Sequence, residues 1–211
     1  MKIKQPEIGS HLEPGKIETV LSDPDFIVED SEVNGSTIAG ESVERLRIFS
    51  STVKNCDFSN TFMDSVDFTD VVFNNCDFSN VKIEDGSIHR TEFRNCRMTG
   101  IQFDKMNFGN VLFEDTKMNL SSVVTSKLEK VLLKDTMLDS TEFHSSQLKQ
   151  VEFEVCSLND MYVHDTPFKS CDISRSYFDS ITLSKEDMTG CTISSSQAVT
   201  FAGLMGLNVV D

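Results

Sequence analysis

The hexapeptide NCDFSN occupies residues 55–60 and returns, letter for letter, at residues 75–80. Around both copies a large apolar residue stands at every fifth position, and this register runs from Val33 to Ile193 without interruption. All 33 of its positions hold Val, Ile, Leu, Met or Phe. Neither the helical period of 3.6 nor the strand period of 2 places every fifth residue on one side. A chain that turns a corner once per five-residue unit does so, and the pattern therefore predicts a solenoid.

A second column lies two residues before the first and holds Ser, Thr, Cys, Gly or Val at 26 of its 33 positions. The unit is therefore small, polar, large apolar, polar, polar. The 20-residue repeat indicates that four units make one square coil, which places residue n above residue n − 20. Columns of identical residues agree, because amide ladders and ring stacking favour parallel coils in register. These columns are Asn55, Asn75 and Asn95; Phe73, Phe93 and Phe113; and Cys56, Cys76 and Cys96.

This unit closely resembles that of the pentapeptide-repeat family, whose motif is A(D/N)LXX with the large residue at its centre; CDFSN and VDFTD match it. The resemblance covers about Ser31 to Ser195 and implies an all-β fold, a right-handed quadrilateral parallel β-helix. The register breaks at both ends of the chain. We therefore expect an N-terminal arm or cap over residues 1–27, the β-helix over 28–195, and a C-terminal cap and dimerisation module over 196–211.

The C-terminal segment leaves the register after Ile193. Ser195 or Ser196 is expected to N-cap a short helix, Gly206 to end it, and Leu207–Val210 to form a short strand. The last coil of a solenoid exposes core and unpaired backbone, so this segment is expected to cover it. It is either a cap alone or a cap that also dimerises, and its large apolar surface favours the second. The residues predicted at the dimer interface are Phe201, Leu204, Met205, Leu207 and Val209.

The chain carries 34 acidic and 19 basic residues, a net charge of -15. This excess repels phosphates and argues against direct binding of nucleic acid or of an anionic membrane. No apolar run approaches the roughly 18 residues of a membrane helix, and the first residues lack the apolar stretch of a signal peptide. We therefore expect a soluble cytoplasmic protein that attracts basic partners.

Few residues are candidates for catalysis or metal binding. All six cysteines fall in the small inward column, where they fill the core and do not converge as a metal cluster requires. His144 and His164 are expected to stack on one face near Glu142 and Asp165; a cation there is conceivable, but two surface histidines enforce no geometry. We find no nucleophile–base pair, phosphate loop or nucleotide motif. The sequence therefore predicts no enzyme, no metal site and no cofactor.

The outward residues divide into four faces of unequal charge. The face centred on Phe68 has four acids and six bases, the face centred on Phe73 has eight acids and four bases, and the other two are each net -3. One column stacks four carboxylates about 4.8 Å apart. Like charges that lie directly opposite each other destabilise a sheet, so this arrangement is unfavourable by itself. Either this column reflects sequence drift at exposed positions, or it binds a basic partner or a cation. It consists of Glu44, Asp64, Glu84 and Asp104.

Within the family the chain is similar to the Qnr-type and MfpA-type quinolone-resistance proteins, in its single rod, its acidic surface and its ending AGLMGLNVV. This resemblance implies an end-to-end homodimer that mimics DNA, binds DNA gyrase or topoisomerase IV, inhibits gyrase and protects it from fluoroquinolones. Because the register has no insertion, the chain resembles the Qnr proteins of the Gram-positive type, which lack projecting loops. The net charge over a rod of roughly 40 Å is about one per 2.7 Å, against about one per 1.7 Å for duplex DNA. The alternative is an interaction scaffold with no topoisomerase role.

A DNA mimic is expected to meet its partner near the dimer axis, on the acidic faces of the C-terminal coils. The face that bears Lys127, Lys130, Lys149 and Lys169 is expected to point away, because it would repel a DNA-binding saddle built from lysine and arginine. The residues predicted to bind the partner are Glu142, Glu152, Glu154, Asp160, Asp165, Asp172 and Asp179.

Overall fold

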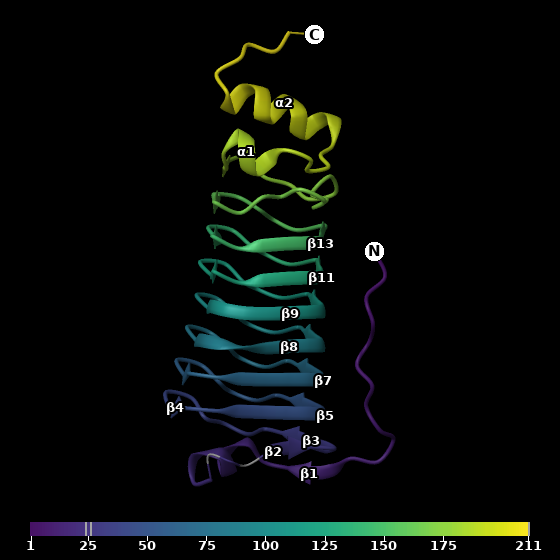
Figure 1. Cartoon of the computed structure of the whole chain (residues 1–211), viewed down its shortest axis with the longest axis vertical. Helices are drawn as coiled ribbons and strands as arrows, with labels where there is room; N and C mark the ends of the chain where they lie inside the picture. The colour runs from purple at the N-terminus through teal and green to yellow at the C-terminus, as the bar shows by residue number, and fades with distance from the viewer. Residues whose placement is uncertain (24, 26, 211) are drawn as a thin grey trace.

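The computed structural model describes residues 1–23, 25 and 27–210, and it confirms a parallel β-solenoid with short helical segments at its ends (Figure 1). From β3 onward, paired strands join residue n to residue n + 20, as between Ser51 and Val71 or between Phe73 and Phe93. The predicted repeat is therefore one full coil. The elements are β1 (Glu13–Gly15), η1 (Ile17–Leu21), β2 (Ile27–Glu29), β3 (Ser31–Asn34), β4 (Ser42–Val43), β5 (Leu46–Lys54), β6 (Phe62–Met63), β7 (Val66–Asn74), β8 (Lys82–Arg94), β9 (Gln102–Glu114), β10 (Ser122–Val124), β11 (Lys127–Lys134), β12 (Glu142–His144), β13 (Gln147–Glu154), β14 (Met161–His164), β15 (Ile181–Thr182), α1 (Lys185–Met188) and α2 (Ser195–Leu204).

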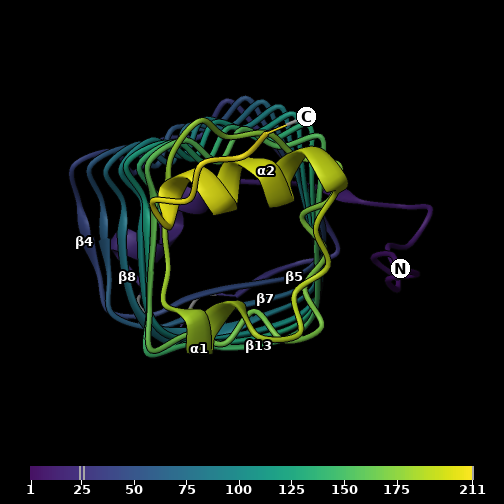
Figure 2. The same cartoon turned by 90° about the horizontal axis from the view of Figure 1, so that it is seen from above.

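Each coil is a square when the rod is seen from its C-terminal end (Figure 2). The chain passes down the left side with β4, crosses the lower side with β5 and β7, and returns along the right and upper sides while it advances toward the viewer. The solenoid is therefore right-handed. We name its sides, in chain order, the Phe68 face, the Phe73 face, the Phe78 face and the Phe103 face, each after a central residue. The Phe68 and Phe78 faces lie opposite each other.

The corners of the square depend on left-handed backbone. Among the described residues, 24 residues other than glycine have a positive φ, and every one of them has a residue number divisible by five. This conformation is unfavourable for most L-residues, and Asn and Asp tolerate it best. The corner position holds Asn55, Asn75, Asn95 and Asp115 along one edge of the rod. The need to turn explains why amide and carboxylate side chains recur there.

The core consists of the two inward columns. Phe93 exposes 1% of its surface and is stacked between Phe73 and Phe113, with ring centroids 4.9 and 5.0 Å away. Five of the six cysteines are buried and Cys191 is half-buried, as the small inward column predicted. Burial raises the pKa of the Cys156 thiol to about 11, so this thiol is protonated at neutral pH.

The first coil is closed by a segment that does not follow the repeat. β1 pairs with β3 in a register shifted by 18 residues, and η1 follows it. Ile17 and Val20 of η1 are 1% and 3% exposed and join the core. These two side chains cover the open end of the solenoid, which would otherwise leave apolar surface in water.

Residues 1–12 leave this cap and run back along the outside of the rod (Figure 1). The Glu7 N–H donates to Asp70 at 2.9 Å and the Lys4 N–H donates to Asn110 at 3.1 Å. Three arm residues thus span two coils, which fits because three extended residues cover about 10 Å and two coils about 9.6 Å. Burial alone would raise the pKa of the Asp70 carboxyl, but its hydrogen bonds from Arg90 and from the arm outweigh burial and lower it.

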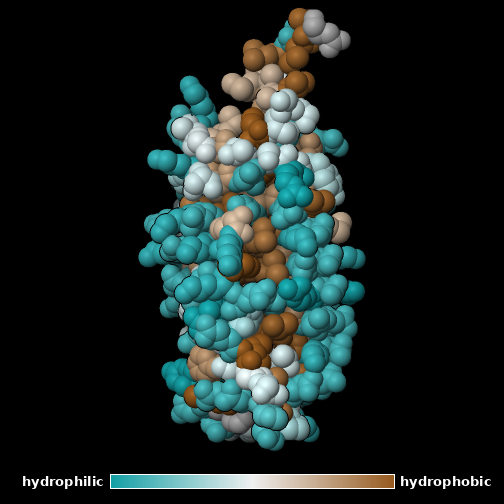
Figure 3. Space-filling model, turned by 90° about the vertical axis from the view of Figure 1, so that its right-hand side faces the viewer, coloured by the Kyte–Doolittle hydropathy of each residue, from teal (hydrophilic) through white to brown (hydrophobic). Residues whose placement is uncertain are grey.

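The arm covers apolar side chains on the outside of the solenoid. Positions 72, 112 and 132 point outward on the Phe73 face yet hold Val, Leu and Leu. Leu112 is only 6% exposed, and Ile3, Pro6 and Ile8 of the arm are half-buried. Figure 3, which views this side, shows apolar side chains gathered between polar ones along the rod. We conclude that the arm shields an apolar strip from water.

Deletion of residues 2–11 is expected to destabilise the protein by roughly 2–4 kcal/mol without unfolding it. Two backbone hydrogen bonds of ~1 kcal/mol each are lost and Leu112 becomes exposed, while the coils keep their own pairing. Thermal and urea denaturation followed by circular dichroism measure the difference. Gln5→Ala, at an exposed arm position, is the control and should melt like the parent. A deletion variant as stable as the parent would show that the docked arm contributes nothing.

Two corrections concern the start of the C-terminal helix and the segment that follows it. Its N-cap is Ser194, one residue before the predicted candidates, because Gln197 completes a capping box with Ser194. Gly206 ends the helix with φ 78°, as predicted, and the Leu207 N–H donates to the Ala202 carbonyl. Residues 207–210 form no strand, contrary to the prediction. They continue beyond α2, away from the coil edges that a strand would need for pairing (Figure 1).

α2 covers the last coil as a cap must. The Gln197 side chain donates to the carbonyls of Ile173 and Ser176 at 2.7 and 2.8 Å. It thereby satisfies backbone groups that have no further coil to pair with. Phe201 is 7% exposed and packs against Phe178, with ring centroids 5.3 Å apart. Of the helices in the described residues, none is long and apolar enough to cross a bilayer.

Candidate functional site

Charge is arranged differently on the four faces. On the Phe73 face, every basic residue of the register forms an ion pair with an acid of the same face. The hydrogen bond from Lys134 and the charges of Arg94 and Lys134 lower the pKa of Glu114, so this carboxyl is ionised at neutral pH. The acids that remain give the face its negative charge. The pairs are Lys54 with Glu32, Arg94 with Glu92 and Glu114, Lys134 with Glu114, and Arg175 with Glu154.

The seven predicted partner-binding acids do not form one patch. They surround the C-terminal coils on three faces, and the fourth, the Phe68 face, carries none of them. Glu152 and Asp172 are direct neighbours on adjacent coils. The placement is Glu152, Glu154 and Asp172 on the Phe73 face, Asp160 and Asp179 on the Phe78 face, and Glu142 and Asp165 on the Phe103 face.

Some of these acids are engaged within the chain. Glu152 accepts a hydrogen bond from the Met1 amino group at 2.7 Å, and Glu154 is 2.6 Å from Arg175. Asp165 lies 3.3 Å from His164. For the remaining four, no lysine or arginine among the described residues lies within ion-pair distance. These four, which keep their charge available to a partner, are Glu142, Asp160, Asp172 and Asp179.

The Phe68 face is more basic than the sequence count predicted. The four acids counted on this face from the sequence include Asp187, but its side chain is only 6% exposed within α1. Its carboxylate accepts hydrogen bonds from the Thr166 N–H at 2.9 Å and from the Ser184 hydroxyl at 2.8 Å. The short helix replaces a regular unit here and turns this side chain inward. Lys127, Lys130 and Lys169 remain exposed or half-exposed on this face.

The carboxylate column on the Phe103 face is partly neutralised. Glu84 and Asp104 are registered neighbours of β8 and β9, as the repeat predicted. The hydrogen bond from Lys82 lowers the pKa of Glu84, and Lys105 lies 3.7 Å from Asp104. Lysines at the flanking positions thus relieve the repulsion between these stacked acids. In the C-terminal coils the same column continues with Val124, His144 and His164.

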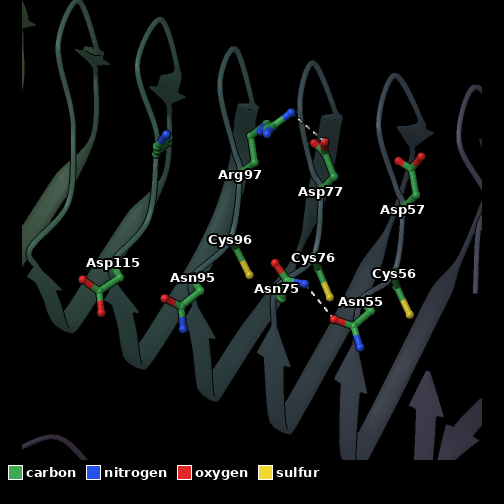
Figure 4. A pocket seen from close by; sticks show the side chains of 11 residues that line it. Asn55, Cys56, Asp57, Asn75, Cys76, Asp77, Asn95, Cys96, Arg97 and Asp115 are labelled. Carbon is green, nitrogen blue, oxygen red and sulfur yellow. Dashed lines mark hydrogen bonds and ion pairs between the residues drawn. The ribbon is translucent and has the colours of Figure 1, made fainter. Parts of the chain in front are cut away.

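An open groove of about 500 Å³ follows the corner between the Phe73 and Phe78 faces (Figure 4). The predicted amide ladder is present, since Asn75 Nδ2 donates to Asn55 Oδ1 at 2.7 Å. Arg97 lies 3.6 Å from Asp77 on the next coil. The groove offers amides and charges of both signs along the rod. Its lining consists of Asn55, Cys56, Asp57, Asn75, Cys76, Asp77, Asn95, Cys96, Arg97, Asp115 and Lys117.

The C-terminal end presents a second kind of surface, which is apolar. Leu204, Met205, Leu207 and Val209 are between 48% and 66% exposed. Phe201 differs, because it is buried within the chain and supports α2 from below. A hollow of about 370 Å³ lies beside α2, and Phe201 forms part of its wall. Its other lining residues are Ile181, Thr182, Leu183, Lys185, Met188, Leu204 and Met205. Sequence reasoning missed Val199, which is 52% exposed, although a helical projection of α2 would have placed it outside.

Two family models and one solved structure agree with this geometry. A model of the pentapeptide repeat region matches residues 86–163, and a model of eight pentapeptide repeats matches residues 52–85. No curated protein sequence matches the chain significantly. HetL, a pentapeptide repeat protein involved in heterocyst differentiation regulation from the cyanobacterium Nostoc sp. strain PCC 7120, is 12% identical, with a TM-score of 0.61 over 84% of this chain and 90% of HetL. QnrB1, a plasmid-mediated fluoroquinolone resistance protein, is 17% identical, with a TM-score of 0.42 over 96% of this chain and 100% of that structure.

Proposed function

The chain belongs to the pentapeptide-repeat family, and from this premise we propose that it is a protein-binding rod whose charge imitates that of DNA. Its partner is the DNA-binding saddle of a type II topoisomerase, DNA gyrase or topoisomerase IV, which it inhibits and protects from fluoroquinolones. The observation that carries the proposal is the distribution of acids around the C-terminal coils. Three faces present carboxylates there, and the fourth is basic.

Acids on three sides suit a partner that surrounds the rod. A flat partner would meet one face, whereas a saddle closes around DNA and touches it from several directions. Asp160 and Asp179 occupy the Phe78 face, opposite the lysines of the Phe68 face. We therefore place the floor of the saddle against the Phe78 face, with Asp172 and Glu142 meeting its two walls. The basic face then points toward solvent, where it repels no lysine or arginine of the partner.

The proposed unit is a homodimer joined end to end through the C-terminal module. Leu204, Met205, Leu207 and Val209 expose apolar surface that a symmetric partner would bury. The hollow beside α2 is large enough for side chains of residues 207–210 from a second copy. Phe201 stays within its own subunit and holds α2 in place. Such a dimer doubles the length of the acidic rod.

Truncation after Gly206 is expected to convert the dimer to a folded monomer. It removes the apolar tail but keeps Gln197 and Phe201, which cap the last coil. A cut after Ile193 would instead uncover the core and cause aggregation. Light scattering coupled to size exclusion at micromolar concentration reports the mass of both forms. An intact chain that is already monomeric would refute the dimer.

A supercoiling assay with purified gyrase, with and without a fluoroquinolone, tests the proposed function. The intact protein should inhibit supercoiling at low concentration, and inhibition should fade as salt rises because charge steers the encounter. The second candidate is an interaction scaffold for another partner, favoured by the mixed charges of the groove in Figure 4, which do not resemble DNA. Absence of inhibition and of binding to gyrase or topoisomerase IV would favour this scaffold.

A further inference from the structure

Two histidines face the same way on adjacent coils of the Phe103 face. His144 ends β12 and His164 ends β14, and the two residues are registered neighbours in this parallel pair. Their ring centroids are 5.1 Å apart, with an angle of 39° between the ring planes. The coils on either side hold both Cα atoms in place. The spacing of the imidazoles is therefore set by the solenoid and not by flexible loops.

A third metal-ligating group stands at the corner that follows. Asp165 has φ 48°, and its carboxylate lies 3.3 Å from Nε2 of His164. One nitrogen of each histidine and one oxygen of Asp165 all lie within 4.8 Å of one another. Ligands of a tetrahedral zinc ion are about 3.3 Å apart, since each bond is about 2.0 Å. All three side chains are exposed, so rotation about their own torsions closes this difference while the backbone stays in place.

We propose that His144, His164 and Asp165 form a binding site for a divalent transition-metal ion, with zinc as the reference ion. Two imidazoles and one carboxylate suit zinc, whereas magnesium and calcium prefer oxygen ligands alone. Three protein ligands leave one tetrahedral position open for water or for a partner's side chain. Glu142 points outward on the same strand as His144 and adds negative charge that favours a cation. This proposal does not depend on topoisomerase binding.

A bound ion would link two coils near the C-terminal end of the rod. β12 and β14 share a short register of three residue pairs, and β14 is followed by coils with fewer paired residues. A ligand that binds the folded protein and not the unfolded chain raises its stability by mass action. The site would thus fasten the part of the solenoid that carries the proposed partner surface.

Isothermal titration of untagged, full-length protein with zinc chloride tests the site. We expect one ion per chain, a rise in melting temperature with zinc, and no heat with magnesium. Cobalt(II) should give the visible absorption of a tetrahedral complex. His144→Ala and His164→Ala should each weaken binding by at least ~10-fold, and the double variant should abolish it. Asp165→Asn should weaken binding without abolishing it.

His89→Ala is the matched control, because His89 is a half-buried surface histidine on the Phe68 face. It should bind zinc like the parent. The three ligand variants should melt like the parent in the absence of metal, since the ligands are solvent-exposed. Zinc binding that survives the double histidine variant would assign the ion to another site and overturn the proposal. Failure of the parent to bind zinc at submillimolar concentration would overturn it as well.

Discussion

Phe93→Asp is expected to abolish the folded state. Phe93 is 1% exposed, stacked between Phe73 and Phe113 and edge-on to Phe78 at 5.8 Å. The variant loses this packing, which costs about 3–5 kcal/mol, and places an unpaired carboxylate in the core at a cost of several kcal/mol more. The sum approaches the ~5–15 kcal/mol by which most domains are stable. Each coil rests only on its neighbours, so a break in the middle separates both halves of the rod.

Circular dichroism and urea denaturation of the purified variant measure this effect. Gln102→Asp is the matched control, because it adds the same side chain at an exposed position of β9, beside Lys82 of the neighbouring coil. It should change stability by no more than ~0.5 kcal/mol. A Phe93→Asp protein with the strand signal and melting curve of the parent would contradict the packing described here.

Reversal of Asp160, Asp172 and Asp179 to lysine is expected to raise the concentration needed for gyrase inhibition by ~10-fold or more. Among the described residues these acids have no lysine or arginine partner, so their charge is available to the saddle. Close charge pairs at interfaces are worth about 1.5 kcal/mol or more each, and reversal replaces attraction by repulsion. Melting should fall only modestly, because Asp160 and Asp179 are exposed and Asp172 is half-exposed, although lysine tolerates the left-handed corner at Asp160 less well than aspartate does. The supercoiling assay provides the measurement.

The control reverses Lys127, Lys130 and Lys169 to glutamate, which changes the net charge by the same amount in the opposite direction. These residues lie on the Phe68 face, away from the proposed contact, so inhibition should be retained or slightly strengthened. Glu142 is left intact in both variants because it borders the proposed metal site. Equal losses from both triple variants would refute the assignment of faces. No loss from either, together with inhibition that is insensitive to salt, would refute DNA mimicry.

The repeat could be predicted from the sequence because every coil meets the same physical demand. An inward position that recurs in each unit must hold an apolar side chain, so the period of five appears directly in the residue types. Stacking in register places like residues together, so Asn55 with Asn75 and Phe73 with Phe93 appear as columns in the sequence itself. Local signals also placed the end of the last helix at Gly206, since a left-handed cap favours glycine.

Features that depend on contacts between non-repeating segments needed the tertiary structure. The arm residues Lys4 and Glu7 are hydrogen-bonded to corners 106 and 63 positions away, and no periodicity links them. Asp187 follows the register yet is turned inward, because a short helix breaks the coil around it.

Likewise, the sequence by itself shows how many acids each face carries, but it does not show which of them are neutralised. Neutralisation depends on whether a flexible side chain such as that of Arg175 reaches an acid of the neighbouring coil. Repetition makes a backbone predictable one unit at a time, whereas the charge left for a partner is decided by side chains that meet only after the coils have stacked.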